Sequence, residues 1–461
     1  YSSYEKGEAM QYLQKYIKKY GVLFTVAILF LVVEAICDLL LPTILATMID
    51  KGVANKDLSF VLDMGGLMLL VTAIGALAAI TRNIISSNIS QKMGAELRFD
   101  LYTKIQTLKL AQMNHFEAAT LVTRLTNDVT QVQIFVNGLM RIMVKAPIIC
   151  IGSIIMAVRL NASISWILLI IIPIVAIIIM LNLKLSFPFF MKVQKVTDRL
   201  NSVMREYLSG IRVIRAFNRS QFEKERFEER NDDLAATTIK ANRVMSIFSP
   251  GIMLTVNFGI VLVLLVGGWN ISKGQMQVGQ IVAYVNYMTQ ILFSLSMISM
   301  IFNFFVRARV SAGRIGEVFS TEEVSGKVDT PATTVHKEGI YFDRVSFSYY
   351  GTEDYVVKDA TFQVNPGETV GIIGSTGSGK SSLVNLLPRL YDPSKGTIYM
   401  NGVNIQTIDP ALLREDIAYV PQKSILFTGS IKENILWGKK DANMEEVKQA
   451  AEAACAHSFI E

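Results

Sequence analysis

Charged residues are scarce in this sequence, and their scarcity argues against a chain built only of soluble domains. Only 18% of the 461 residues are Asp, Glu, Lys or Arg, whereas 51% are hydrophobic and the mean hydropathy is +0.37. A soluble domain carries about 25% charged residues. The apolar residues are concentrated before Val310. The composition therefore indicates a membrane part followed by one soluble domain.

Cysteine and histidine are also rare. The three cysteines, Cys37, Cys150 and Cys455, are isolated and form no CxxC pair, and the first two lie inside apolar runs. This spacing argues against a disulfide framework or a zinc site and favours inert, structural thiols. The net charge of +6 is spread over loops that we expect to face the cytosol, so it does not indicate nucleic-acid binding.

Long apolar runs are what the sequence does contain. A helix needs about 20 apolar residues to cross the core of a bilayer. Six segments meet this requirement: Gly21 to Ile49, Leu58 to Thr81, Ile142 to Val158, Ile164 to Leu183, Val244 to Trp269 and Gln280 to Val306. The third contains Lys145, whose long side chain we expect to reach the headgroups, with Arg141 marking that end as cytosolic.

Lysine and arginine predict the orientation of these spans. Thirteen of them lie between residues 184 and 243, whereas the three short opposite loops hold only Lys51, Lys56, Arg159 and Lys273. The long loops are therefore expected in the cytosol. Residues 82–110 contain no proline and continue the helical pattern of the second span, so they predict an extension of about 40 Å beyond the membrane at 1.5 Å per residue.

Polar residues within the spans are candidate substrate contacts. Glu34 and Asp38 are four residues apart and share a helix face. An acid at that depth is costly unless it is paired. It could contact a cationic substrate or a proton, but hydrogen bonding to neighbouring helices is the favoured interpretation. Asn286 and Gln290 could similarly line a cavity or bond between helices.

The composition changes after Arg314. Residues 317–339 are polar and include a Thr run and Pro331, which predicts a linker. Short strand-like segments follow: IYFDRVSFSY (340–349), VVKDATFQV (356–364), TVGIIG (369–374), GTIYMNG (396–402) and DIAYVPQ (416–422). TVGIIG runs directly into a glycine-rich loop, after which a helix is expected from about Lys380 to Leu390.

The glycine-rich loop matches the phosphate-binding pattern GxxxxGK[ST]. Gly374, Gly377 and Gly379 let backbone N–H groups converge on phosphates, and the following helix adds its positive dipole end. Lys380 is expected to reach the β and γ phosphates of ATP, and Ser381 to bind Mg²⁺. The residues expected to bind the nucleotide along this loop are Gly374, Ser375, Thr376, Gly377, Ser378, Gly379, Lys380, Ser381 and Ser382.

With this loop, the chain resembles ABC transporters over essentially its whole length, and exporter-type half-transporters in particular. LTNDV (125–129) and GIRVIRAFNR (210–219) are similar to the loops that carry coupling helices in such exporters, and ILFTGSIKENI (425–435) is similar to the stretch after the family's glutamine. The resemblance implies that Tyr349 stacks on adenine. It also implies that Gln422 contacts the metal and the attacking water, so that Gln422 and Lys380 are the expected catalytic residues.

The second half of the family's nucleotide domain does not appear in the sequence, including its signature, Walker B and switch segments. Because the sequence begins at Tyr1 and stops within what reads as a helical subdomain, we expect incomplete coverage of a longer chain. The resemblance also implies a partner half-transporter. VVEAICD (32–38) and LTNDVTQVQ (125–133) are similar to subunits of bacterial heterodimeric multidrug exporters, which favours a heterodimer over a homodimer.

The sequence therefore predicts a six-helix transmembrane domain with long cytosolic helical extensions (1–316), a linker (317–339), and the N-terminal part of an α/β P-loop ATPase domain (340–461). The expected function is ATP-driven export of hydrophobic or amphipathic compounds across a membrane, most simply a bacterial plasma membrane, by alternating access. A lipid or peptide exporter and a regulatory subunit that binds ATP without efficient hydrolysis are the alternatives. A nucleotide-gated channel is disfavoured, since nothing resembles a separate regulatory region.

Overall fold

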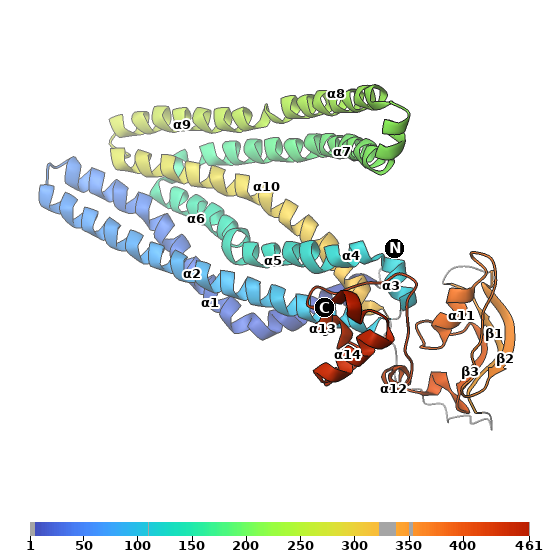
Figure 1. Cartoon of the computed structure of the whole chain (residues 1–461). Coiled ribbons are helices and arrows are strands. Elements are labelled where there is room, and N and C mark those ends of the chain that lie inside the picture. The colour runs from blue at the N-terminus through green and yellow to red at the C-terminus, as the bar shows by residue number, and fades with distance from the viewer. Residues whose placement is uncertain (1–4, 109, 322–337, 350–353, 461) are drawn as a thin grey trace. The chain divides into compact units, whose positions relative to one another are not determined.

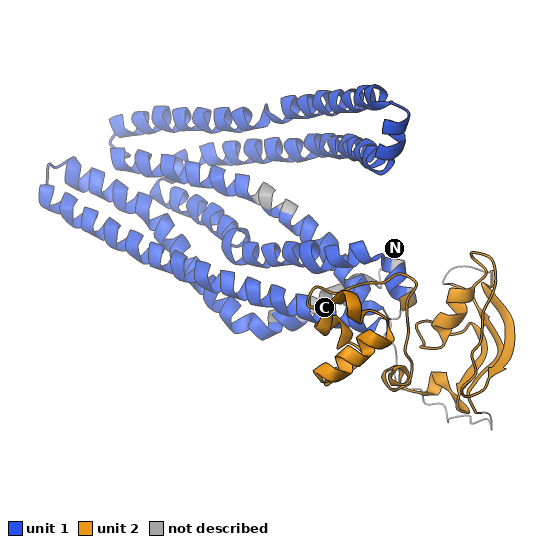
Figure 2. Cartoon of the chain, in the orientation of Figure 1, with its two compact units in different colours: residues 1–108, 112–323 blue, residues 109–111, 324–461 orange. Residues whose placement is uncertain are grey.

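The computed structural model describes residues 5–108, 110–321, 338–349 and 354–460. These residues belong to two compact units, one made of residues 1–108 and 112–323 and the other of residues 109–111 and 324–461 (Figure 2). The first residues of the predicted linker are still helical, because the last helix of the first unit ends at Ser320. Residues 322–337, which form most of that linker, lie outside the described ranges.

The described residues of the first unit form helices joined by short turns, apart from an isolated bridge residue at Leu108 (Figure 1). Its α-helices are α1 (Glu5–Thr47), α2 (Leu58–Thr107), α3 (Leu110–Phe116), α4 (Ala118–Thr123), α5 (Val129–Gly138), α6 (Lys145–Leu160), α7 (Trp166–Ala216), α8 (Ser220–Met245), α9 (Phe248–Ser272) and α10 (Val278–Ser320). Three π-helical turns lie between them: η1 (Met48–Val53), η2 (Arg124–Asp128) and η3 (Leu139–Met143). A 3-10 turn, η4 (Ala162–Ile164), precedes α7.

Local hydrogen bonds explain where two of the long helices begin. Asp57 caps α2 by accepting a hydrogen bond from the backbone N–H of Phe60 at 3.1 Å. Gln277 and Gln280 form a reciprocal capping box at the start of α10. Such caps satisfy backbone donors that the first turn of a helix leaves unpaired. The short connections between the spans are therefore specified by the sequence itself.

Five helical stretches of the described residues are long and apolar enough to cross a membrane: Lys18–Val53, Leu58–Thr107, Ala118–Leu160, Trp166–Ala216 and Ser220–Ser272. They contain the first five predicted spans, except for Ile164 and Ser165 at the start of the fourth. The sixth predicted span, Gln280 to Val306, lies within α10, where the side chains of residues 298–300, 302 and 303 are outside the described set. Large apolar side chains such as Leu69, Leu169 and Leu254 are more than 70% exposed on these helices, as expected for surfaces that face lipid.

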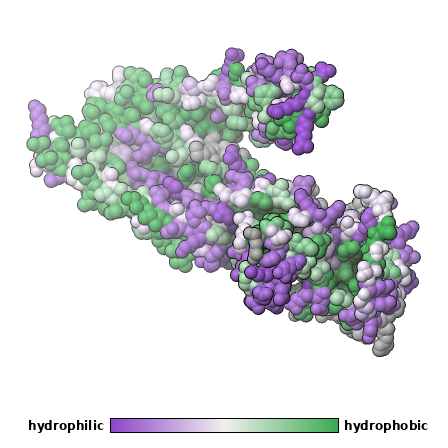
Figure 3. Space-filling model, viewed as in Figure 1, coloured by the Kyte–Doolittle hydropathy of each residue, from purple (hydrophilic) through white to green (hydrophobic). Residues whose placement is uncertain are grey.

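The helices extend well beyond the apolar segments. The helix through residues 82–110 is confirmed except for its last residues, because α2 is unbroken from Leu58 to Thr107. Fifty residues of α-helix span about 75 Å, more than twice the core of a bilayer. α7 and α8 likewise run on to a hydrophilic tip, whereas the surface over α9 is mostly hydrophobic (Figure 3).

Two groups of buried side chains hold the first unit together. One lies between α6, α7, α9 and α10 and includes Ile167, Val263 and Tyr284. The other lies between α1, α2, α5 and the end of α10 and includes Leu97, Val132 and Val318. The second group shows that the helical extensions pack against one another and are not isolated helices in solvent.

The second unit contains a four-stranded antiparallel sheet (Figure 1). The strands are β1 (Ile340–Phe347), β2 (Val357–Val364), β3 (Lys395–Met400) and β4 (Val403–Asn404), in the order β2-β1-β3-β4. The helices of this unit are α11 (Lys380–Leu386), which lies between β2 and β3, and α12 (Pro410–Glu415), α13 (Ile431–Ile435), α14 (Met444–Ala453) and α15 (His457–Ile460), which follow the 3-10 turn η5 (Ile405–Thr407). The buried core includes Phe342, Val345, Leu386 and Ile398.

Two of the predicted strands are wrong for the described structure. TVGIIG (369–374) and DIAYVPQ (416–422) have apolar strand-like sequences, but neither is a strand. Ile373 is 98% exposed and Val420 is 92% exposed, so no neighbouring strand covers them in this part of the chain. A strand requires a ladder partner, which sequence pattern alone does not provide. The helix after the loop also ends earlier than predicted, at Leu386.

Candidate functional site

The glycine-rich loop of the second unit folds around the amino group of Lys380. Its Nζ donates to the backbone carbonyl oxygens of Gly374 at 2.8 Å and Ser375 at 2.7 Å, and lies 3.5 Å from Ser378 Oγ. Lys380 is also the first residue of α11, with Gly379 as its N-cap. The loop, the cation and the start of the helix therefore form one electropositive element, which suits an anionic group.

Glycine is required at one position of this loop for two separate reasons. Gly379 has φ +87°, in the left-handed region, and a Cβ atom there would lie 2.6 Å from the carbonyl oxygen of Val356. Gly377 has a similar φ of +84°, but a Cβ atom would meet nothing within 4 Å. The two glycines therefore share a backbone conformation and differ in the space around them.

Two serines follow Lys380 on α11 and differ in their surroundings. Ser381 is exposed at the mouth of the loop, where its hydroxyl can reach a bound ion. Ser382 is buried, and its hydroxyl lies 2.8 Å from the hydroxyl of Tyr349. The side chain of Ser382 thus connects the loop to Tyr349.

Tyr349 lies at the end of β1, where two aromatic rings hold it. Its ring meets the edge of Phe347 at 4.9 Å and of Tyr391 at 5.4 Å between centroids, and it remains 37% exposed. Aromatic contacts of this kind fix the orientation of a ring. The structure therefore places the aromatic residue expected to stack on adenine next to the phosphate loop.

Gln422 lies in an irregular, exposed segment. Three residues earlier, the hydroxyl of Tyr419 donates to Asn385 Oδ1 of α11 at 2.8 Å. Three residues of extended chain span at most about 10 Å, so this bond tethers the segment of Gln422 to α11. No direct contact between Gln422 and the loop is among those of the described residues.

The segment after Gln422 is held by α13. Ser430 and Glu433 form a capping box, and the hydrogen bonds from the backbone N–H and hydroxyl of Ser430 hold the pKa of Glu433 below its usual value. The ring of Phe427 stacks on Trp437 with centroids 4.2 Å apart. Local contacts therefore define the position of ILFTGSIKENI (425–435) in the absence of a strand.

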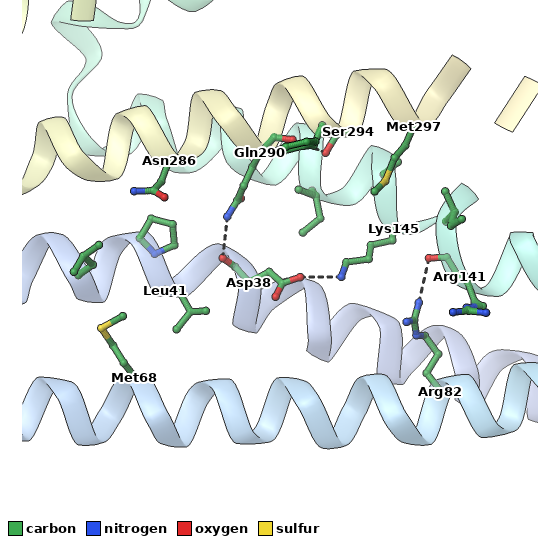
Figure 4. Close-up of a pocket in the computed structure, with 16 residues that line it drawn as sticks. Asp38, Leu41, Met68, Arg82, Arg141, Lys145, Asn286, Gln290, Ser294 and Met297 are labelled. Atoms are coloured by element: carbon green, nitrogen blue, oxygen red, sulfur yellow. Dashed lines mark hydrogen bonds and ion pairs between the residues drawn. The ribbon is translucent and has the colours of Figure 1, made fainter. Parts of the chain in front are cut away.

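A cavity of about 550 Å³ lies between helices of the first unit (Figure 4). Its volume falls in the range of small-molecule sites, roughly 300 to 1,000 Å³. Asp38, Asn286 and Gln290 line it, whereas Glu34 does not. Three of the four candidate substrate residues are therefore brought together. Apolar walls come from α1, α2, the start of α6 and α10 and include Leu41, Leu45, Met68, Ile149, Phe293 and Met297.

Both acids of the first span are paired. Glu34 Oε1 is 2.6 Å from Lys145 Nζ, Glu34 Oε2 is 3.1 Å from Arg82 Nε, and Lys145 Nζ is also 2.9 Å from Asp38 Oδ2. The prediction that Lys145 extends to the headgroups is wrong, because two carboxylates at short distance bind its ammonium group more strongly than the interface would. The charged groups at this depth largely neutralise one another.

The two amides of α10 have different roles. Gln290 accepts a hydrogen bond from Ser153 Oγ at 2.8 Å and donates to the backbone oxygen of Asp38 at 3.2 Å, so it joins α1, α6 and α10. Among the described residues, Asn286 donates to the carbonyl oxygen of Val282, one turn earlier on its own helix, at 2.9 Å, and to no other group. Asn286 therefore has polar capacity left on the cavity side.

Sequence reasoning missed Arg82 and treated Arg141 only as a marker of orientation. Arg82 is almost fully buried, and besides Glu34 it donates to the backbone oxygen of Arg141 at 3.1 Å. Both arginines line the cavity. The position of Arg82 directly after the second span could have drawn attention to it. Its partner, Glu34, lies on another helix and is distant in sequence, so the pairing could not be predicted.

Asp128 of the LTNDV segment is another buried acid. It accepts hydrogen bonds from Ser311 Oγ at 2.8 Å and from Arg314 at 2.6 Å, both on α10. Arg124 also pairs with Glu317 at 2.8 Å. The LTNDV segment is thus fixed to the end of α10, the helix that leads toward the second unit along the chain.

Comparison with known proteins is consistent with this geometry. A family model described as "ABC transporter transmembrane region" matches residues 24–295, and one described as "ABC transporter" matches residues 357–459. The uncharacterized ABC transporter ATP-binding protein YfiB of Bacillus subtilis is 36% identical over 98% of this chain and 78% of its own length. A Mycobacterium tuberculosis (H37Rv) protein, also named an uncharacterized ABC transporter ATP-binding protein, is 35% identical over 97% of this chain and 78% of its own.

A third relative has a more informative name. The fatty acid ABC transporter ATP-binding/permease protein of Mycobacterium bovis is 30% identical over 80% of this chain and 58% of its own length.

Proposed function

We propose that this chain, which belongs to the ABC transporter family, is one half of a dimeric exporter that uses ATP to move hydrophobic or amphipathic compounds across a membrane by alternating access. The family makes the chain an integral membrane protein and a transport ATPase, and its bacterial relatives point to the plasma membrane. The observation that carries the proposal is one chain holding both a phosphate loop closed around Lys380 and a cavity between membrane helices.

The residues present fit ATP and Mg²⁺. Lys380, whose Nζ now contacts two loop carbonyls, would hold the β and γ phosphates, and the loop N–H groups would donate to the same anion. Ser381 and Gln422 would hold the Mg²⁺, which supplies charge neutralisation, and Gln422 would orient the attacking water. Tyr349 would stack on adenine, because its ring is held in place beside the loop.

Alternating access requires a second half and a sixth span. α10 supplies a helix of suitable length for that span, with its predicted apolar part between Gln280 and Val306. The Lys and Arg distribution favours a cytosolic position for the helical extensions and for the nucleotide domain. We infer that a partner half-transporter completes the pathway, with a heterodimer favoured over a homodimer.

The substrate class follows from the cavity. Its mostly apolar walls and few polar groups suit an amphipathic compound, and the fatty acid transporter among the relatives is named for such a compound. A lipid exporter of the same architecture is therefore the second candidate. Peptide export and a regulatory subunit that binds ATP without efficient hydrolysis remain alternatives that the transport experiment separates.

The experiment is ATP-driven transport in proteoliposomes that contain the full protein with its partner. Lys380→Ala removes the cation that binds the phosphates, and we expect transport and ATP turnover to fall at least tenfold if this subunit's site is catalytic. Lys440→Ala, which removes an exposed lysine of the same unit, is the matched control. Unchanged nucleotide binding and transport in Lys380→Ala would remove the mechanism.

A further inference from the structure

The cavity carries more positive than negative charge. Its ionisable lining residues are one acid, Asp38, and three bases, Arg82, Lys145 and Arg141. Glu34 does not line the cavity, but its carboxylate forms ion pairs with Arg82 and Lys145. The two acids therefore neutralise two of the three bases, and the cluster keeps a net charge of one positive unit.

Arg141 holds that charge. No carboxylate lies within the 4 Å ion-pairing distance of its guanidinium among the described residues, whereas Arg82 and Lys145 each have one or two such partners. Arg82 donates to the backbone oxygen of Arg141 at 3.1 Å and so fixes the main chain that carries this side chain. Arg141 also lies in η3, a π-helical turn directly before α6, and such turns are frequent at functional sites.

The three bases of the cavity lie toward one of its ends. In Figure 4, Arg82, Arg141 and Lys145 lie toward that end together with Met297, whereas Leu41, Met68 and the uncharged Asn286 lie toward the other. Along α2, Met68 and Arg82 are fourteen residues apart, which is about 21 Å of helix. The cavity therefore suits a molecule with an extended apolar tail and a head group at one end.

Only the head group can give selectivity here. The tail gains little by leaving the bilayer, because lipid chains are as apolar as the cavity wall. A cationic head would meet the Arg141 guanidinium and a carboxylate of Asp38 that Lys145 already holds at 2.9 Å. An anionic head would instead form charge-assisted hydrogen bonds with the guanidinium.

We propose that the cavity binds amphiphiles with one anionic head group, and that Arg141 is the residue that recognises the head. This inference rests on the proposed export function and makes its substrate class specific. It reverses the expectation that Glu34 and Asp38 recognise cations, since both carboxylates are engaged with bases of the protein.

The test measures binding without ATP, in nanodiscs of phosphatidylcholine that hold the full protein with its partner. Three probes share the same tail: dodecyl sulfonate and dodecyltrimethylammonium, each below its micellar concentration, and dodecanol, below its solubility limit. We expect the sulfonate to bind at least about tenfold more tightly than the alcohol, because one charge-assisted hydrogen bond contributes enough free energy for that ratio. The ammonium should bind more weakly than the alcohol. Stronger binding of the ammonium would overturn the proposal.

Variants make the test specific to Arg141. Arg141→Gln should abolish the preference for the sulfonate, whereas Arg159→Gln, which removes an exposed arginine at the other end of α6, should not. Asp38→Asn frees Lys145 from one partner and should raise sulfonate affinity several-fold. A preference retained in Arg141→Gln would show that Arg141 is not the recognition residue.

A further arm identifies the source of the anion. Short-chain phosphatidylglycerol added to the same nanodiscs should compete with the sulfonate if the natural ligand is an anionic phospholipid, and should not if it is a single-chain anion. Because all of these measurements are made without ATP, Lys380→Ala should keep the sulfonate preference even where it stops transport. Loss of transport with the preference intact would therefore separate the substrate class from the proposed coupling to ATP.

Discussion

Glu34 makes the most quantitative prediction in the membrane part, because it forms two ion pairs and its side chain is only 10% exposed. At an effective dielectric constant of about 20, distances of 2.6 and 3.1 Å correspond to roughly 5 to 6 kcal/mol of attraction for each pair. The cost of removing these ions from water offsets much of it. Glu34→Gln keeps the side-chain size and leaves two bases without that carboxylate. We expect a loss of about 3 to 5 kcal/mol in the free energy of unfolding.

The assay is reversible unfolding in mixed micelles titrated with a cationic denaturing detergent, because an anionic one would itself be a ligand of the proposed cavity. Asp38→Asn is the matched control, because Asp38 is 40% exposed and Lys145 keeps Glu34 as a partner, so its cost should stay below about 1 kcal/mol. Combining Glu34→Gln with Arg82→Gln restores the charge balance. The double variant should therefore be at least about 1 kcal/mol more stable than the sum of the single effects predicts. Two results would refute the reasoning: a loss of unfolding free energy in Glu34→Gln as small as that in Asp38→Asn, or losses in Glu34→Gln and Arg82→Gln that simply add in the double variant. Either result would mean that water screens the ion pairs of Glu34.

Two further predictions concern the phosphate loop and the LTNDV segment. Gly379→Ala should weaken binding of a fluorescent ATP analogue far more than Gly377→Ala, because both need positive φ but only Gly379 would place a Cβ atom 2.6 Å from a backbone oxygen; equal losses would mean that φ alone matters. Asp128→Asn should cost about 1 to 3 kcal/mol in the same unfolding titration, since it weakens two hydrogen bonds to a buried carboxylate. Glu317→Gln, which changes a side chain that is 49% exposed, should cost less than about 1 kcal/mol. A larger loss in Glu317→Gln than in Asp128→Asn would contradict the argument that burial makes the Asp128 contacts the more stabilising ones.

The sequence predicts best those elements whose physical cause is local. Apolar length predicts the spans, and the unbroken helical pattern of residues 82–110 predicts the extension of α2, because a helix satisfies its own backbone. The alternating pattern of IYFDRVSFSY also predicts β1 correctly, and here β2 and β3 provide the partners that a strand needs. TVGIIG and DIAYVPQ have equally strand-like compositions, but their backbones need partners elsewhere in space, and the described residues provide none.

The candidate sites likewise divide into one formed by consecutive residues and one formed by residues that are distant in sequence. The phosphate loop is formed by consecutive residues, so its spacing in sequence is also its geometry, and the motif alone places Lys380 at the centre of the loop. The pairing of Glu34 with Lys145 joins residues 111 apart in the chain. No local pattern predicts that contact, and the sequence therefore suggested that Lys145 reaches the headgroups.

Contacts between distant segments also determine the sign of the net charge in the cavity. Within the first span, Glu34 and Asp38 are two acids without a base, so a reading of that span alone indicates a negative site. Three other segments supply Arg82, Arg141 and Lys145, and their contacts use both carboxylates. Because burial of like charges is costly, charges at this depth must be counted over the whole cluster and not helix by helix. Counted in that way, the group left without a carboxylate partner among the described residues is the guanidinium of Arg141, and the cavity is positive.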